Sequence, residues 1–277
     1  MKRLASRKGL ASRFGVEFVD ESWPYLEVKS WPGVVRVVGE AKRESTGRVF
    51  VRGQTENYRA MRPRLFRGAT TDDESLVVAA GEFASKLGNR VNVGRFKVPD
   101  VGSLLQHYGF KTNWLDVLDN LFVAYWFAAH KVSEETNGAI RIGNSGKTSG
   151  WLFLLRPPPL ATVVDLRVSH HPLSSRPHVQ HGISLACAHG TKADFQDWVV
   201  ATIQTPVSEC VSGSLFTGPA LFPPRASDHT LRLLLKHKAN ELAARVESSH
   251  QLPERSLGRI SHWQDATVTS ASNNTVS

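Results

Sequence analysis

Short apolar runs bounded by glycine, proline or polar residues recur along the chain and predict β-strands. The runs are rich in valine, leucine and phenylalanine, and prolines interrupt one of them because proline cannot continue a hydrogen-bonded ladder. The predicted strands are residues 34–39, 47–54, 151–159, 161–168 and 198–206.

Longer stretches carry apolar residues at helical spacing and predict helices. Gly109 is the expected end of the helix predicted at residues 99–108. The third, residues 116–130, is apolar nearly all round, which predicts a buried central helix capped by Asp116 or Asp119. Strands and helices together predict an α+β fold, with a mixed or split β-sheet flanked by helices in one main domain. The predicted helices are residues 72–88, 99–108, 116–130 and 227–246.

Composition adds a globular core and a basic excess to this picture. The chain has 277 residues, of which 41% are hydrophobic and 21% charged, and its formal net charge is +9. Such a charge is compatible with nucleic acid as a partner. No apolar run approaches the ~20 residues of a membrane helix, so no membrane is expected. Two cysteines, Cys187 and Cys210, make a disulfide scaffold unexpected and favour a cytoplasmic location.

The two ends of the chain differ in composition from its middle. The first residues are rich in Arg, Lys and Ser and carry no acid before Glu17. The last fourteen residues carry one charged side chain and no core-forming pattern. The predicted parts are a basic N-terminal arm with leading strands (1–45), the main domain (46–236), a C-terminal helical extension (237–262) and a disordered tail (263–277).

Several familiar motifs are incomplete or missing. The stretch "GNSGKTSG" has Arg141 where a phosphate loop needs its first glycine, and a strand-like run follows it instead of a helix. Histidines crowd residues 170–189 without the spacing of a metal site, so no metal is expected. Neither a GxSxG elbow nor a dinucleotide-binding GxGxxG occurs.

Polar residues gather where two predicted helices meet. Gln106, His107 and Tyr108 stand directly before a helix-ending glycine, and Asp116 begins the buried helix. Their side chains offer donors and acceptors that a buried helix would hold rigidly. The alternative is that Asp116 only caps the helix and His107 only satisfies a backbone carbonyl.

Arg52 ends a predicted strand and precedes Gly53. Its planar guanidinium suits phosphate or carboxylate, and a glycine beside it lets a ligand approach the backbone. The alternative is a structural salt bridge from Arg52 to Asp116.

Five sequence blocks together resemble the FRG domain, a bacterial and phage family named for its Phe/Tyr-Arg-Gly signature. The resemblance covers roughly residues 46–236, and Gln-His-Tyr-Gly is its most specific part. The chain departs from the family pattern at Val51, Asn113, Val117 and Leu118. The blocks are "VRGQ" (51–54), "RPRLFRG" (62–68), "LLQHYGFKTNWLDVLDNLFVAYWFA" (104–128), "RPHVQHGI" (176–183) and "SLFTGPALFPP" (214–224).

"VRG" and "VAYWFA" (123–128) are also similar to a strand and a helix of ADP-ribosyltransferases. This likeness implies NAD as cofactor, with Arg52 on its phosphate or ribose. Gln180 stands where such enzymes carry a catalytic Glu, so the carboxylate is expected from Asp116 or Glu209. The catalytic candidates are His107, Asp116 and Gln180, and the cofactor-binding candidates are Arg52, Gly53, Gln54, Gln106, Tyr108 and Thr112.

Two functions stay open on these grounds. The first is an NAD-using transferase or NAD glycohydrolase in phage defence or a toxin role, which would take a small-molecule nucleotide. The second is a non-catalytic module that binds a ligand or nucleic acid, which the positive charge and the missing Glu favour.

Overall fold

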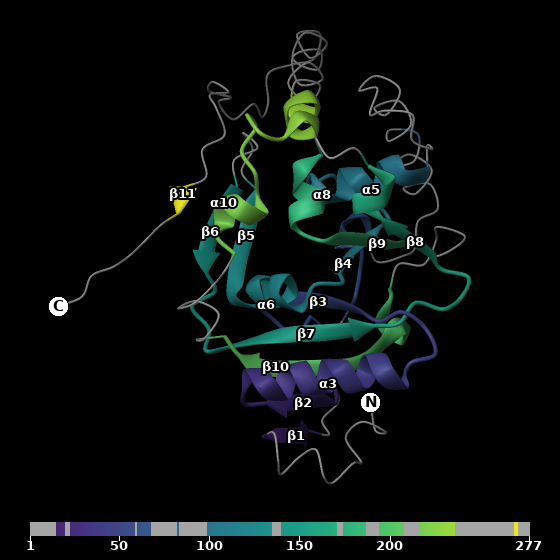
Figure 1. Cartoon of the computed structure of the whole chain (residues 1–277), viewed down its shortest axis with the longest axis vertical. Coiled ribbons are helices and arrows are strands. Elements are labelled where there is room, and N and C mark those ends of the chain that lie inside the picture. The colour runs from purple at the N-terminus through teal and green to yellow at the C-terminus, as the bar shows by residue number, and fades with distance from the viewer. Residues whose placement is uncertain are drawn as a thin grey trace, which may run out of the picture.

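The computed structural model describes most of residues 15–235 and a short segment near the C-terminus (Figure 1). The predicted helix at 72–88, apart from Glu82, the first fourteen residues, the extension at 237–262 and most of the predicted tail lie outside the described residues. The described residues are 15–19, 23–58, 60–67, 82, 99–134, 140–170, 174–186, 194–207, 216–235 and 269–270.

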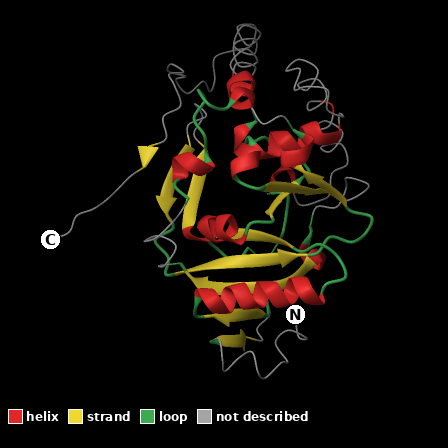
Figure 2. Cartoon of the chain, in the orientation of Figure 1, coloured by secondary structure: helices red, strands yellow, loops and turns green. Residues whose placement is uncertain are grey.

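An eight-stranded mixed sheet forms the centre of the molecule, and helices flank it (Figure 2). Strand β2 pairs with β10 in parallel, and the other pairings in this sheet are antiparallel. The predicted α+β fold with a mixed sheet is thereby confirmed. The strands, in spatial order, are β1 (Val16–Val19), β2 (Tyr25–Val28), β10 (Val199–Pro206), β7 (Ser149–Leu155), β3 (Phe50–Gln54), β4 (Leu115–Leu118), β9 (Gly182–Ala186) and β8 (Thr162–Asp165).

A second, small sheet lies beside the main one. Its hairpin consists of β5 (His130–Glu134) and β6 (Ile140–Asn144), and β11 (Thr269–Ser270) pairs with β6. The helices are α3 (Trp31–Glu44), α5 (Pro99–His107), α6 (Leu121–Ala129), α7 (Leu166–Ser169), α8 (Ser175–Val179) and α10 (Gly218–Leu221), with 3-10 turns η1 (Arg64–Phe66) and η2 (Gln196–Trp198). Residues 229–235 are also helical.

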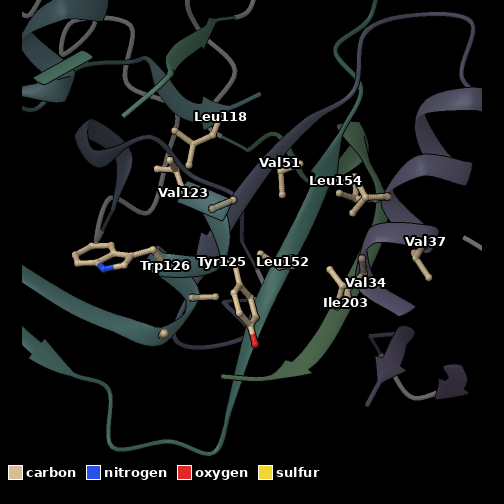
Figure 3. Close-up of a cluster of buried hydrophobic side chains, with 14 of the residues drawn as sticks. Val34, Val37, Val51, Leu118, Val123, Tyr125, Trp126, Leu152, Leu154 and Ile203 are labelled. Carbon is tan, nitrogen blue, oxygen red and sulfur yellow. The ribbon is translucent and has the colours of Figure 1, made fainter. Parts of the chain in front are cut away.

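The main core lies between the central strands and the two helices α3 and α6 (Figures 1 and 3). Leu152 and Leu154 of β7 face this core, whereas Phe153 between them faces a second cluster on the opposite side of the sheet. This alternation is the period of two that a strand imposes. Strands β3 and β4, which carry Arg52 and Asp116, are interior strands of this sheet.

The predicted strand at residues 34–39 is wrong, because these residues belong to helix α3. Val34, Val37 and Val38 are buried and Val35 is exposed, which is helical spacing. Ser30 caps the helix by accepting a hydrogen bond from the Gly33 N–H, and proline stands in the first turn.

The predicted helix at 116–130 is also wrong in its first part. Residues 115–118 form β4, which is held between β3 and β9, and the helix begins at Leu121. Its cap is Asn120, whose side chain accepts hydrogen bonds from the N–H groups of Phe122 and Val123. Neither Asp116 nor Asp119 caps α6, so the predicted capping role of Asp116 is wrong.

The predicted strand at 161–168 is only half right, since β8 ends at Asp165 and helix α7 follows. The Asp165 carboxylate accepts a hydrogen bond from the Arg167 N–H and thereby caps α7. Among the described helices, none is long and apolar enough to cross a membrane.

Candidate functional site

A cavity of about 190 Å³ opens where the end of α5 meets strands β3 and β4. Pockets for drug-sized ligands hold about 300–1,000 Å³, so this one suits a single ring or sugar instead of a whole dinucleotide. It brings together five of the nine candidate residues and adds three apolar ones. The lining residues are Arg52, Gly53, His107, Asp116, Leu118, Phe127, Gln180 and Phe222.

His107 is the last residue of α5 and is buried, with 8% of its surface exposed. Its Nδ1 lies 3.3 Å from Gln180 Oε1, in a hydrogen bond. Its Nε2 lies 3.3 Å from Asp116 Oδ1, but the orientation does not make a hydrogen bond, and Nε2 has no other partner among the described residues. The imidazole is therefore anchored at one nitrogen and available at the other.

Asp116 contributes the carboxylate of the cavity from the middle of β4. Its side chain is 27% exposed, and the Ser184 hydroxyl approaches Oδ1 from the adjacent strand at 3.5 Å. A carboxylate in this position can stabilise positive charge on the imidazole or on a ligand.

Arg52 reaches the cavity from β3, and its Nη1 donates a hydrogen bond to the backbone carbonyl of Asp116. This bond goes to the main chain and not to the carboxylate, unlike the salt bridge considered from the sequence. Burial lowers the pKa of Arg52 to about 10, and the like charge of Arg67 acts in the same direction, while Asp116 opposes them. Arg52 Nε is buried without a hydrogen-bond partner in the described part of the chain. A cation held this way favours an anionic ligand.

Gly53 lines the cavity, but its missing side chain serves the packing of α6. A Cβ atom on residue 53 would lie 1.7 Å from the carbonyl oxygen of Ala124. The glycine thus lets the helix backbone approach the strand, which differs from the expected approach of a ligand. Gln54 does not line the cavity, and its buried Oε1 has no hydrogen-bond partner among the described residues.

Gln106, Tyr108 and Thr112 lie outside the cavity lining and brace its wall. The Thr112 hydroxyl donates to Gln106 Oε1 at 2.8 Å and accepts from the Trp114 N–H at 3.3 Å. The loop after α5 begins at Gly109, whose φ of 83° needs a glycine. These residues hold the His107 end of α5 in place and do not line the cavity.

Tyr108 belongs to a buried network behind His107 that the sequence did not predict. The Tyr108 hydroxyl lies 2.9 Å from both carboxylate oxygens of Asp228, which has no exposed surface. Asp228 also accepts from the N–H groups of Arg176 and Leu231, and the second of these bonds caps the helical residues 229–235. Burial raises the pKa of the Tyr108 hydroxyl well above its usual range, and the Asp228 charge adds to the rise.

Arg176 fills the space between this network and the cavity. Its guanidinium lies 4.9 Å from the centre of the Tyr108 ring and 5.4 Å from that of Phe222. Its Nη1 donates to the backbone carbonyl of His107 at 3.2 Å. The block "RPHVQHGI" pointed to this segment, but only the fold shows that the arginine is buried beside His107.

Other acidic groups near the sheet are already paired. Arg167 Nη2 lies 2.6 Å from Asp119 Oδ2 and 2.7 Å from Asp165 Oδ2. These bonds hold the pKa of Asp165 below its usual range, and His181 lies beside the cluster, 3.5 Å from Asp119. Within the described ranges, no group of His, Cys, Asp and Glu could hold a metal ion. Cys187, Cys210 and Glu209 fall outside those ranges.

The FRG domain family model matches residues 47–137. This stretch of the chain is thus similar to the FRG domain. The matched residues include Arg52, His107 and Asp116, whereas Gln180 and Phe222 join the cavity from beyond the match. Comparison of the chain with curated proteins and with solved structures gave no match. The likeness to ADP-ribosyltransferases remains a prediction from the sequence.

Proposed function

We propose that the cavity is the active site of an NAD-using enzyme with ADP-ribosyltransferase-like chemistry, either a transferase or an NAD glycohydrolase. The observation that carries the proposal is the convergence of a guanidinium, an imidazole and a carboxylate, from Arg52, His107 and Asp116, on one small cavity. Titratable groups of opposite character in one cleft are typical of catalytic sites.

The cavity suits the nicotinamide-ribose end of NAD in size and lining. Phe127 and Phe222 supply apolar walls. Their rings are arranged edge to face, with 6.0 Å between the ring centres. Arg52 is the cation for a phosphate or a ribose hydroxyl. The remainder of the dinucleotide would extend out of the cavity, whose volume is about 190 Å³.

The reaction breaks the bond between ribose C1′ and the nicotinamide nitrogen, and the electron pair leaves with nicotinamide. The Asp116 carboxylate stabilises the positive charge that develops on the ribose. His107 Nε2 takes a proton from the incoming water or target group, whose freed electron pair forms the new bond to C1′. Asp116 thus supplies the carboxylate that the sequence analysis expected from Asp116 or Glu209, since Gln180 carries no charge.

Release of nicotinamide from NAD by the purified chain, followed by chromatography, tests the proposal. We expect His107→Gln and Asp116→Asn to lower this activity by about 10²-fold or more, the scale of lost acid–base catalysis. His229→Gln is the matched control, since His229 lies outside the cavity and pairs with Arg232. Absence of both turnover and NAD binding at millimolar concentration contradicts the proposal.

A second outcome would favour the non-catalytic alternative. Binding of nucleic acid that weakens with salt and persists in His107→Gln, with no effect of NAD, indicates a binding module. If NAD is consumed, expression in the cytoplasm should slow growth, and the same two active-site variants should relieve it. That growth assay tests the toxin or phage-defence role.

A further inference from the structure

Two residues of the α8 segment, Arg176 in its first turn and Gln180 directly after its last residue, bind the backbone and the side chain of His107. Arg176 and Gln180 stand four positions apart, so they project from the same side of a helical turn. Arg176 binds the His107 backbone carbonyl at 3.2 Å, and Gln180 binds the imidazole Nδ1 at 3.3 Å. Both are buried, with 2% and 4% of their surfaces exposed.

The hydrogen bonds around Gln180 have a fixed direction. Gln180 Nε2 lies 2.8 Å from the backbone carbonyl of Leu221, which can only accept. The amide nitrogen must therefore face Leu221, and Oε1 must face His107. Because Oε1 can only accept as well, the proton of that bond belongs to His107 Nδ1.

We propose that Gln180 is a positioning residue that holds neutral His107 as the Nδ1–H tautomer and makes Nε2 its proton-accepting atom. The free nitrogen then lies 3.3 Å from the Asp116 carboxylate. When Nε2 gains a proton during the reaction, the neighbouring Asp116 carboxylate stabilises the positive charge of the imidazolium. This inference rests on the proposed function for its catalytic meaning, but the tautomer itself does not depend on any activity.

Leu221 links the hydrogen bonds of Gln180 and His107 to the cavity wall. Its carbonyl orients Gln180, and the next residue, Phe222, lines the cavity and contacts the Arg176 guanidinium. The position of the Phe222 ring in the cavity wall and the tautomer of His107 thus both depend on the C-terminal end of α10. In this proposal Gln180 acts through His107, whereas the sequence analysis placed Gln180 among the catalytic candidates.

The ¹⁵N NMR shifts of the imidazole nitrogens, recorded on the whole chain above the imidazole titration range, test the tautomer. The His107 signals are assigned by their loss in His107→Gln. We expect a protonated Nδ1 and an unprotonated Nε2 in the unmodified protein. The opposite pattern overturns the proposal without any variant, so a failure to fold cannot hide it.

Two variants sharpen the test. Gln180→Met keeps the volume but removes the acceptor, and we expect the Nδ1–H preference to be lost and turnover to fall by about 10²-fold. Gln204→Met is the matched control, because Gln204 donates to Ser149 away from the cavity. An unchanged His107 spectrum in Gln180→Met contradicts the proposal. If the tautomer is as expected and NAD is not consumed, the proposed function fails and the positioning role stands.

Discussion

The imidazole of His107 occupies the space that a side chain on residue 182 would need. A Cβ atom on Gly182 would lie 2.5 Å from His107 Cε1 and 2.8 Å from Nε2. Gly182 opens β9, directly after the segment that contains Gln180. Gly182 therefore belongs to the site, because the absence of a side chain at this position leaves space for the His107 imidazole.

We expect Gly182→Ala to push the imidazole away from Asp116 and to abolish most of the activity. The buried ring has little space to move, so overpacking should also lower the free energy of unfolding by about 1–3 kcal/mol. Urea denaturation and the nicotinamide assay measure the two effects. Gly143→Ala is the control, because nothing lies within 4 Å of a Cβ there. Normal activity in Gly182→Ala would contradict this placement of His107.

Gly53→Ala should be more damaging to the fold. Its Cβ would meet the Ala124 carbonyl oxygen at 1.7 Å, and a helix backbone cannot shift as a flexible side chain can. We expect α6 to separate from β3, with little soluble protein and a lowered melting temperature. A variant that folds with unchanged stability would show that α6 does not rest on this glycine.

Gly39→Ala should act in the opposite direction. Gly39 is exposed in the middle of α3, and a Cβ there meets nothing within 4 Å. Alanine loses less conformational freedom in a helix, so we expect a gain of about 0.5–1 kcal/mol in the free energy of unfolding. Thermal or urea unfolding measures it, and a loss of stability would argue against the helix at this position.

The bond between Tyr108 and Asp228 should be a large contributor to stability. Tyr108→Phe removes a buried donor to a carboxylate with no exposed surface, and we expect a loss of about 1–3 kcal/mol. Asp228→Ala should lose more, because it also strands the N–H groups of Arg176 and Leu231. Equal stability of Tyr108→Phe and the unmodified chain in urea would contradict the network.

Acid should weaken the fold through Asp165. Hydrogen bonds from Arg167 hold the pKa of Asp165 below its usual range, so its stabilising effect is complete above the ordinary aspartate pKa. The effect is lost as the pH falls through the lowered value. We expect Asp165→Asn to be less stable than the unmodified chain at neutral pH, and the difference to shrink in acid. Thermal midpoints of both proteins across this range measure it, and a constant difference would be contrary to expectation.

Local pattern sufficed for the elements that carry their own signals. Strands β3, β7 and β10 and helix α5 before Gly109 followed from apolar runs and punctuating residues. Strand β4 could not, because "LDVL" is too short to be distinguished from the start of the helix beyond it. Its extended form depends on β3 and β9 at its two sides, which are distant in the sequence.

The site shows the same division. Arg52, His107 and Asp116 stood out because polar groups at the ends of strands and helices are recognisable one at a time. The hydrogen bonds that orient His107 could not be predicted in this way. They come from Gln180 and Arg176, and Leu221 binds Gln180 in turn, and the partners in each bond lie far apart in the sequence. The aromatic walls were hidden for another reason, because a phenylalanine looks the same whether it fills a core or faces a cavity.

The pairing of β3 with β7 has a consequence for dividing the chain. The stretch 47–137 contains β3 and β4, but the strands hydrogen-bonded to their outer edges, β7 and β9, come later. An isolated fragment with those limits would expose two sheet edges and separate His107 from the amide that orients it. The matched stretch is thus smaller than the sheet that holds it, and a fragment of this chain that keeps β3 and β4 fully paired must also include β7 and β9.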